Sequence, residues 1–326
     1  MKIGILGATG AVGRQMLECI KERNIPAEEI RLFASERSKG TIIDGLTVQV
    51  ANEDTIQGLD VMLGAVSNAL SKEYAPLLLK HHILYIDNSS AFRSDKDIPL
   101  VVPEINGEDA LNHHGIIANP NCSTIITLMA LAPVAKLTKI TNIIATTFQA
   151  VSGAGIPGLK ELREEEKALY EGTEYSPSVF PYPIAHNVIA EIGSYLDNGY
   201  TTEEMKMQNE GRKILHLPDL TVNCTCVRVP VERCHSISVT FETEQDISIP
   251  AIEEAIEKHP GVELLKEGIP TPLKTSNQDT VYVGRIRISP CHKNEKVLWC
   301  CGDQIRKGAA SNAVQILEYV LAHQKG

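Results

Sequence analysis

The sequence predicts an α/β protein with an N-terminal doubly wound sheet and a second α+β domain built on a mixed or antiparallel sheet. Short apolar segments alternate with helix-like segments through the first third of the chain, as they do in parallel sheets. Longer segments with period-two alternation, 237–243 and 281–288, follow later. The 326 residues also suffice for two domains that each bury a core. We expect a first domain over 1–120, a second over 121–303, and a C-terminal helix at about 304–326 that packs back on the first.

The first elements along the chain are an apolar strand, Lys2–Leu6, a glycine turn, and a helix over 14–23 whose apolar residues have helical spacing. Residues 71–81 also have the pattern of a helix. Further buried strands are predicted at three short apolar runs, 30–34, 61–66 and 83–86. Because strands and helices alternate, this part of the chain predicts a parallel sheet.

The pattern changes around Asn119-Pro120-Asn121. An apolar segment at 125–131 is compatible with a helix, and that helix would carry Cys122 in its first turn. The last predicted helix spans about 309–323, where apolar residues recur at helical spacing.

The net charge argues against a nucleic-acid-binding protein, and the lengths of the apolar runs argue against a membrane protein. The formal charge is −10 and the basic residues are dispersed, which argues against a nucleic-acid partner. The N-terminus has no apolar region behind a basic start, and no stretch approaches the roughly 18 apolar residues of a membrane span. We therefore expect a cytoplasmic protein that does not enter a membrane.

The eight cysteines lie mostly inside apolar runs and do not resemble the framework of a small secreted domain, so we expect reduced thiols. Cys224, Cys226, Cys234 and His235 raise the alternative of a zinc site. Their spacing matches no closed four-ligand pattern, and alternation along a strand explains them better. We expect no metal.

The glycine turn predicts a Rossmann-like cofactor site. Gly7, Gly10 and Gly13 follow the first strand and open a helix, where a backbone without side chains can approach a pyrophosphate at the helix N-terminus. Glycines also serve tight turns and close packing, so it is the position after the first strand that favours the cofactor. We expect the rest of the turn to contact the cofactor as well, at Thr9, Ala11 and Val12.

The end of the second strand favours NADP as the cofactor. NAD-binding sites usually have an acidic residue here for the ribose hydroxyls. Ser35, Arg37 and Ser38 can instead hold a 2′-phosphate, with the guanidinium supplying charge and donors. The alternative is a solvated loop with an incidental arginine, and Glu36 leaves NAD possible.

Cys122 has the position of a reactive thiol. At the first turn of a helix, unpaired N–H groups and the helix dipole favour the thiolate, and the same N–H groups can bind an oxyanion. A small apolar residue that starts a buried helix is the alternative, and for an isolated cysteine it is the usual one.

Two segments resemble the catalytic segments of bacterial-type aspartate-semialdehyde dehydrogenases: Asn119–Thr124 (NPNCST) and Gln149–Gly155 (QAVSGAG). The resemblance extends over nearly the whole chain, through SSAFR at 89–93, VPEIN at 102–106, EEMK at 203–206, RVPV at 228–231 with His235-Ser236, and GDQ at 302–304. Several ordered motifs are far more specific than one. The chain departs from the family at GAVSN, 64–68, where a Ser-Ala-Gly-Gly turn is common, and at Ile126 and Cys234, where a more polar or smaller residue is expected.

The resemblance implies that Cys122 is the acyl-accepting nucleophile, that Gln149 orients the acyl group and that His235 is the acid/base. It implies that Arg228 holds the substrate carboxylate and Glu203 the substrate amine. It implies further contacts, with phosphate for Arg93 and Lys206, and with the nicotinamide side of the cofactor for Ser152, Gly153 and Gln304.

Several of these residues have structural alternatives. His235 alternates with Ile237, Val239 and Phe241 and is compatible with a core histidine. Arg228 in an apolar strand needs an anion, which is either a substrate carboxylate or a buried structural one. Glu203 and Lys206 are three apart and are compatible with a surface ion pair. Glu204 fits a helix-start capping box with Thr201, so we leave it out of the site.

The implied reaction converts L-aspartyl 4-phosphate and NADPH to L-aspartate 4-semialdehyde, NADP and phosphate, through a thioester on Cys122. The family implies a role in the biosynthesis of lysine, diaminopimelate, threonine and methionine, and a homodimer or homotetramer formed by the second, catalytic and dimerisation domain. One alternative is a reductase of another acyl phosphate or of a CoA thioester such as malonyl-CoA. Another is a non-catalytic relative that binds nucleotide or a partner chain.

Overall fold

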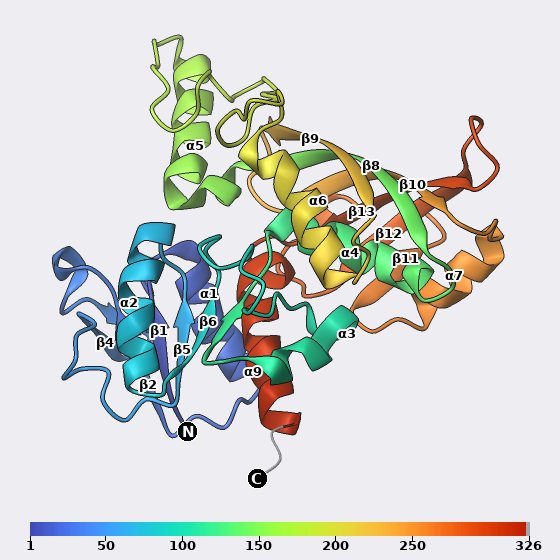
Figure 1. The fold of residues 1–326 in the computed structure, drawn as a ribbon. Helices are drawn as coiled ribbons and strands as arrows, with labels where there is room; N and C mark the ends of the chain where they lie inside the picture. Colours follow the sequence, from blue (N-terminus) through green and yellow to red (C-terminus); the bar gives the residue numbers. More distant parts are fainter. Residues whose placement is uncertain (324–326) are drawn as a thin grey trace. The chain divides into compact units, whose positions relative to one another are not determined.

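The computed structural model describes residues 1–323, which form two compact units. Unit 1 consists of Met1–Asn121 together with the segment that begins at Ala309, and unit 2 is Cys122–Gly308 (Figure 1). Residues 304–308, expected with the C-terminal helix, belong to unit 2 instead. Residues 324–326 of that predicted helix lie outside the described residues.

Within the described residues, seven strands form the sheet of unit 1, in the order β3-β4-β2-β1-β5-β6-β7. Their bounds are β1 Lys2–Leu6, β2 Glu29–Phe33, β3 Ile42–Ile43, β4 Leu46–Gln49, β5 Val61–Gly64, β6 Leu84–Asp87 and β7 Ile116–Ala118. Every described pair in this sheet is parallel except β3 with β4. Strand order reverses on the two sides of β1, and ligands of doubly wound sheets bind at such a switch point.

Helices cover both faces of this sheet, as a doubly wound fold requires (Figure 1). On one face, α1 (Ala11–Glu22) and α9 (Ser311–His323) share a core with Ile3, Ile5 and Leu63. On the other face, α2 (Asn68–Lys80) packs over Phe33, Met62 and Tyr85. The shorter helical segments of unit 1 are η1 Glu36–Ser38, α3 Pro103–Asn106 and η2 Gly107–Asn112. The predicted doubly wound domain is confirmed.

Unit 2 contains a mixed sheet whose described strands have the order β11-β12-β13-β10-β8-β9. Two of the pairings, β8 with β9 and β11 with β12, are parallel, and the other three are antiparallel. The bounds are β8 Ile140–Ala150, β9 Thr221–Val229, β10 His235–Thr243, β11 Val262–Leu265, β12 Val281–Ile288 and β13 Glu295–Gly302. The prediction of a second domain with a mixed sheet is confirmed.

The central helix of unit 2 is α4 (Cys122–Ala135), which is buried on nearly every side. It lies between the sheet and two other helices, which explains a sequence that is apolar all round. The other helical segments of unit 2 are η3 Val151–Ala154, α5 Gly155–Glu171, α6 Thr202–Ile214, α7 Ile249–Glu257 and α8 Pro272–Thr275. The π-helical turn η4, Arg306–Ala310, begins in unit 2 and contains the point at which the chain returns to unit 1. Among residues 1–323, no helix is long and apolar enough to cross a bilayer.

Candidate active site

Cys122 and His235 meet inside unit 2. Cys122 is the first residue of α4 and His235 is the first residue of β10. The Sγ atom of Cys122 lies 3.4 Å from Nε2 of His235. The imidazole is fully buried, and burial together with the positive charge of Arg228 lowers the pKa of His235 to about 3. His235 is therefore neutral at physiological pH.

The backbone determines which ring nitrogen of His235 carries the proton. The N–H of Ala150 donates a hydrogen bond to Nδ1 of His235 over 3.1 Å. A neutral imidazole whose Nδ1 accepts must carry its proton on Nε2. The N–H of His235 therefore points at Cys122, an arrangement that stabilises a thiolate.

Gly308 lies directly behind Cys122 and was not predicted from the sequence. A Cβ added at Gly308 would be 2.8 Å from Cβ of Cys122 and 3.3 Å from its Cα. Only glycine leaves the nucleophile in its present place. Nothing in the local sequence, Gly308-Ala309-Ala310, distinguishes this glycine from an ordinary small residue.

Arg228, on β9, is buried and has no carboxylate partner within residues 1–323. Its Nη1 donates to the carbonyl oxygen of Ala150 at 2.7 Å, and its guanidinium lies over the Phe180 ring, 5.6 Å from the centroid. Burial lowers the pKa of Arg228 because the charged form loses its hydration. The alternative of a buried structural carboxylate is thus not realised in the described part of the chain, and the guanidinium lines a cavity of about 440 Å³.

Glu203 is hydrogen-bonded to two predicted site residues, Gln149 and Lys206. Nε2 of Gln149 donates to Oε1 of Glu203 at 3.4 Å, and Nζ of Lys206 donates to Oε2 of Glu203 at 2.8 Å. Glu203 is only 9% exposed, so its pair with Lys206 is not a simple surface ion pair. The predicted capping box of Thr201 and Glu204 is confirmed, with both reciprocal hydrogen bonds present.

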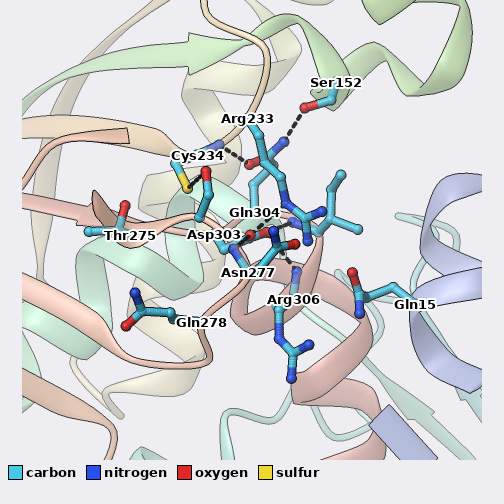
Figure 2. Close-up of polar contacts among 12 residues, drawn as sticks. Gln15, Ser152, Arg233, Cys234, Thr275, Asn277, Gln278, Asp303, Gln304 and Arg306 are labelled. Carbon is cyan, nitrogen blue, oxygen red and sulfur yellow. Dashed lines mark hydrogen bonds and ion pairs between the residues drawn. The ribbon is translucent and has the colours of Figure 1, made fainter. Parts of the chain in front are cut away.

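The side chain of Gln304 is hydrogen-bonded to two segments of unit 2, one at Ser152 and the other at Cys234, directly before β10. Figure 2 shows its side chain between Ser152 and Cys234. Nε2 of Gln304 donates to Oγ of Ser152 at 2.6 Å, and the N–H of Cys234 donates to Oε1 of Gln304 at 2.7 Å. Because Cys234 precedes His235, these bonds help to place the imidazole. The cofactor contacts of Ser152 and Gln304 stay predictions.

Gly153 leaves room for the Arg228 guanidinium. A Cβ at Gly153 would be 2.8 Å from Nη1 of Arg228 and 3.4 Å from Cε1 of His235. Gly153 therefore has a packing role in the structure, in addition to its predicted contact with the cofactor.

Asp303 is a buried centre of hydrogen bonds that the sequence did not single out (Figure 2). Its carboxylate accepts from Nε of Arg233 at 2.6 Å and from the N–H groups of Asn277, Ile305 and Arg306 at 2.7, 2.9 and 3.0 Å. Asp303 thereby fixes the backbone on both sides of Gln304. The only signal in the sequence was its place in the GDQ motif.

In unit 1 the glycine turn has the geometry of an anion site. Gly7 has φ +87°, and a Cβ there would be 2.3 Å from the carbonyl oxygen of Ala65. Gly10 is the N-cap of α1 and provides no side-chain cap, so the first N–H groups of the helix are left for a ligand. Thr9, Ala11 and Val12 are half-buried around this turn.

The segment after β2 leaves Arg37 exposed. Ser35, Arg37 and Ser38 lie in and next to η1, and the side chain of Arg37 makes no ion pair within residues 1–323. Glu36 is the acidic residue that left NAD possible. Its Oε2 atom lies 3.7 Å from Nζ of Lys39.

Arg93, predicted to bind phosphate, belongs to unit 1 and is buried at the carboxyl edge of the sheet. Its Nε donates to the carbonyl oxygen of Asn119 at 2.9 Å, and its Nη2 donates to that of Asn88 at 2.7 Å. Asn88 and Asn119 directly follow β6 and β7, so the ends of two strands hold the guanidinium.

The zinc alternative has no support in the described residues. They contain no group of three or more His, Cys, Asp or Glu side chains that could hold a metal. Cys224 and Cys226 lie on one face of β9 with their sulfur atoms 3.7 Å apart.

Comparisons with known proteins define the class of this two-unit fold as a semialdehyde dehydrogenase. Residues 2–113 match the family model of the semialdehyde dehydrogenase NAD binding domain, and residues 131–307 match that of the semialdehyde dehydrogenase dimerisation domain. The chain belongs to the aspartate-semialdehyde dehydrogenase family.

The relatives are similar over their full lengths. Aspartate-semialdehyde dehydrogenase of Synechocystis is 43% identical, covering 98% of this chain and 97% of the relative. That of Bacillus subtilis is 42% identical, covering 98% and 96%. The structure of aspartate semialdehyde dehydrogenase II from Vibrio cholerae, complexed with ASA, has a TM-score of 0.96, 42% identity and 99% coverage of both chains. These matches support an oxidoreductase of amino-acid biosynthesis that uses a nicotinamide cofactor.

Proposed function

We propose that the protein reduces L-aspartyl 4-phosphate to L-aspartate 4-semialdehyde with NADPH, through a thioester on Cys122, for the synthesis of lysine, threonine and methionine. One observation carries this proposal. The Cys122–His235 contact lies in the same unit as a buried Arg228 that has no carboxylate partner among the described residues. A nucleophile beside an unpaired cation fits a substrate with both an acyl group and a carboxylate.

The chemistry begins with the Cys122 thiolate, which the N–H on Nε2 of His235 stabilises. The sulfur attacks the acyl carbon, an S–C bond forms, and the C–O bond to phosphate breaks with its electron pair on phosphate. When bound, the nicotinamide cofactor would supply the hydride for reduction of the resulting thioester. The N–H of His235 donates a hydrogen bond to the oxyanion of the tetrahedral species; the C–S bond then breaks with its electron pair on sulfur, which gives the aldehyde and returns Cys122 as the thiolate. Gln149, held by Glu203, orients the acyl group.

The substrate groups have separate partners in this proposal. Arg228 binds the α-carboxylate, and the Glu203 carboxylate binds the α-amine. Lys206 and Arg93 bind the phosphate group. Arg93 suits this role because backbone carbonyls already fix its guanidinium, which lowers the entropy lost on binding.

We propose NADP as the cofactor. The pyrophosphate binds at the turn from Gly7 to Gly13, where the uncapped N-terminus of α1 supplies donors. Ser35, Arg37 and Ser38 bind the 2′-phosphate, and Ser152, Gly153 and Gln304 contact the nicotinamide side. The exposed Arg37 and the proximity of Glu36 to Lys39 support NADP over NAD.

We also propose a homodimer or homotetramer that forms through unit 2. The matched domain is described as a dimerisation domain. Unit 2 also exposes large apolar side chains on α5 and the loops that follow it, at Leu169, Tyr170, Tyr182, Val188 and Tyr195. A partner chain would cover these exposed apolar side chains in the proposed oligomer. Light scattering after gel filtration measures the mass, and a monomer would contradict the proposal.

One assay tests the function. The protein is incubated with aspartate semialdehyde, phosphate and NADP, and NADPH is followed by its absorbance. We expect phosphate-dependent reduction of NADP that disappears in Cys122→Ala. Turnover of a CoA thioester without turnover of the semialdehyde would instead identify an acyl-CoA reductase. Nucleotide binding without either activity would identify a non-catalytic relative.

A further inference from the structure

Two buried glutamates on α5 hold a distant loop by its backbone. Glu161 and Glu165 are four residues apart, so they lie on one face of the helix, and they are 2% and 3% exposed. Both accept hydrogen bonds from the segment 178–193, which we call the strap. In Figure 1 the chain that follows α5 runs back beside that helix.

Glu161 holds the beginning of the strap with both of its oxygens. Oε2 accepts the N–H groups of Ser178 and Val179, each at 2.7 Å, and the Ser178 hydroxyl at 2.8 Å. Oε1 accepts the N–H of Phe180 at 2.9 Å. Burial alone would raise the pKa of Glu161, but these four donors outweigh it and the pKa is lowered. The carboxylate stays charged and its hydrogen bonds are correspondingly strong.

Glu165 holds the middle of the strap more weakly. Its Oε2 accepts the N–H groups of Ile184 and Ala185, each at 2.7 Å. Its Oε1 has no hydrogen-bond partner within the described residues. Glu161 is therefore the better anchored of the two, and its replacement is the more informative test.

The strap in turn supports Arg228. Phe180 places its ring 5.6 Å from the guanidinium carbon. Ile189 exchanges both backbone hydrogen bonds with Arg228, at 2.9 and 2.8 Å. Together with Ala154 and Arg228, the strap also lines the cavity of about 440 Å³ through Val179, Phe180, Pro181, Glu191, Ile192 and Gly193.

We propose that Glu161 and Glu165 are positioning residues for substrate recognition, because they hold the strap that supports the Arg228 guanidinium and closes its cavity. This inference rests on the proposed function of Arg228 as the carboxylate-binding residue. The two glutamates touch no reacting atom. They act through Phe180 and Ile189, so they govern the binding of the carboxylate and not the chemistry at Cys122.

The first experiment compares Glu161→Gln with Glu166→Gln, the same substitution at an exposed position of α5. A glutamine has one acceptor oxygen and turns an NH₂ group toward backbone donors, so it cannot accept all four hydrogen bonds. We expect KM for aspartate semialdehyde to rise about tenfold in Glu161→Gln, with kcat and the KM values for phosphate and NADP within about threefold of wild type. Glu166→Gln should behave as wild type. An unchanged KM for the semialdehyde, or an equal rise for all three substrates, would overturn the inference.

A second variant covers the case in which Glu161→Gln does not fold. Phe180→Leu keeps an apolar side chain and leaves Glu161 in place, but it removes the ring beneath Arg228. We expect KM for aspartate semialdehyde to rise about threefold with kcat retained. A Phe180→Leu enzyme with the wild-type KM would show that the strap does not support the carboxylate site.

Hydrogen exchange separates failure of this inference from failure of the proposed function. Mass spectrometry measures exchange at the amides of 178–185 in the enzyme without substrate. We expect these amides to exchange at least tenfold faster in Glu161→Gln than in wild type and in Glu166→Gln. Unchanged protection would overturn the role of Glu161 even if the enzyme reduces its substrate as proposed. If wild type does not turn over aspartate semialdehyde, the proposed function is rejected. Faster exchange in Glu161→Gln than in wild type would then still support the anchoring role of Glu161.

Discussion

The N–H of His235 points at the sulfur of Cys122, with 3.4 Å between Nε2 and Sγ. The first residue of a buried helix and the first residue of a central strand thus form one pair. The backbone N–H of Ala150 fixes the tautomer, and burial beside Arg228 keeps the ring neutral. The pair is therefore arranged to stabilise a thiolate, and its properties depend on a histidine that is difficult to protonate.

We predict that His235 makes the free energy of unfolding depend on pH below about 6.5. The unfolded histidine has a pKa of 6.5, whereas the folded one has a pKa of about 3. Between these values the unfolded state binds more protons, so acidification favours unfolding. The stabilising contribution of the neutral ring is fully present above pH 6.5 and is lost as the pH falls toward 3. This site alone should lower the free energy of unfolding by about 1 kcal/mol from pH 6.5 to 5.5.

Urea unfolding at pH 7.5, 6.5 and 5.5 measures this effect, with His235→Gln as the comparison. Carboxylates elsewhere contribute equally to both proteins, so the difference between the two curves isolates the histidine. The difference should be flat above pH 6.5. Parallel curves over the whole range would show that the folded imidazole titrates normally.

The second prediction concerns Gly153→Ala. Its new methyl group would lie 2.8 Å from Nη1 of Arg228, which is the end of a flexible side chain and can move. The fold should therefore tolerate the change, while the guanidinium leaves its position. We expect KM for aspartate semialdehyde to rise about tenfold and the melting temperature to change by less than about 3 °C. Gly211→Ala, whose Cβ would meet Leu220 at an ordinary 3.5 Å, is the matched control. A normal KM in Gly153→Ala would mean that Arg228 does not bind the carboxylate in its present position.

The third prediction concerns Cys234, which has a φ of +75°. A side chain at this φ is strained, whereas glycine is not. Cys234→Gly and Cys234→Ala both remove the sulfur, but only the alanine keeps the Cβ. We expect the glycine variant to be more stable by about 1 kcal/mol, the reverse of the usual order within helices and strands. Urea unfolding of the two variants decides this, and a more stable alanine variant would refute the strain.

Regular elements were predictable because their periodicity is local. Lys2–Leu6 and Val281–Ile288 have the predicted bounds. Cys122 begins α4, as the apolar run that follows it had suggested. The two-residue strand Ile42–Ile43 was missed because two residues cannot show alternation. The parallel, doubly wound character of the first sheet followed from the strand–helix alternation, whereas the order of its strands was not predicted.

The support of the site was not predictable, because it depends on contacts between distant backbone and side-chain groups. The N–H of Ala150 that sets the tautomer of His235 carries no signature in the residue type. Phe180 lies in a loop without periodicity, and its place under Arg228 depends on Glu161, on a different element. The catalytic side chains could be proposed because the resemblance named them. Their supports could not be, because the motifs do not contain them.

The fourth prediction tests NADP at the exposed Arg37. This side chain makes no ion pair in the described residues, so its loss should leave the melting temperature unchanged. If it binds the 2′-phosphate, Arg37→Ala should raise KM for NADP about tenfold and leave KM for NAD unchanged. Lys72→Ala, which removes another exposed cation of unit 1, controls for the loss of general positive charge. Equal KM changes for NADP and NAD would remove Arg37 from the phosphate site.

The last prediction separates the glycines of the turn that the fold needs from the one that the cofactor needs. A Cβ at Gly13 would lie 2.3 Å from the carbonyl oxygen of Gly7 and 2.8 Å from Cα of Ala8, and backbone atoms cannot easily move away. A Cβ at Gly10 would meet nothing closer than 3.4 Å, and the φ of Gly10 is −76°. Gly13→Ala should therefore lower the free energy of unfolding by at least about 2 kcal/mol, whereas Gly10→Ala should change it by less than about 0.5 kcal/mol.

NADP binding, in contrast to stability, should be impaired in Gly10→Ala. An added methyl at Gly10 stands where the pyrophosphate must approach the N-terminus of α1, so KM for NADP should rise at least fivefold in a fully folded enzyme. Urea unfolding and NADP titration of Gly10→Ala measure the two effects independently. Because the fold does not require glycine at this position, normal NADP binding by Gly10→Ala would show that the cofactor does not approach the turn at Gly10. A strongly destabilised Gly10→Ala would show that the fold, and not the cofactor, requires this glycine.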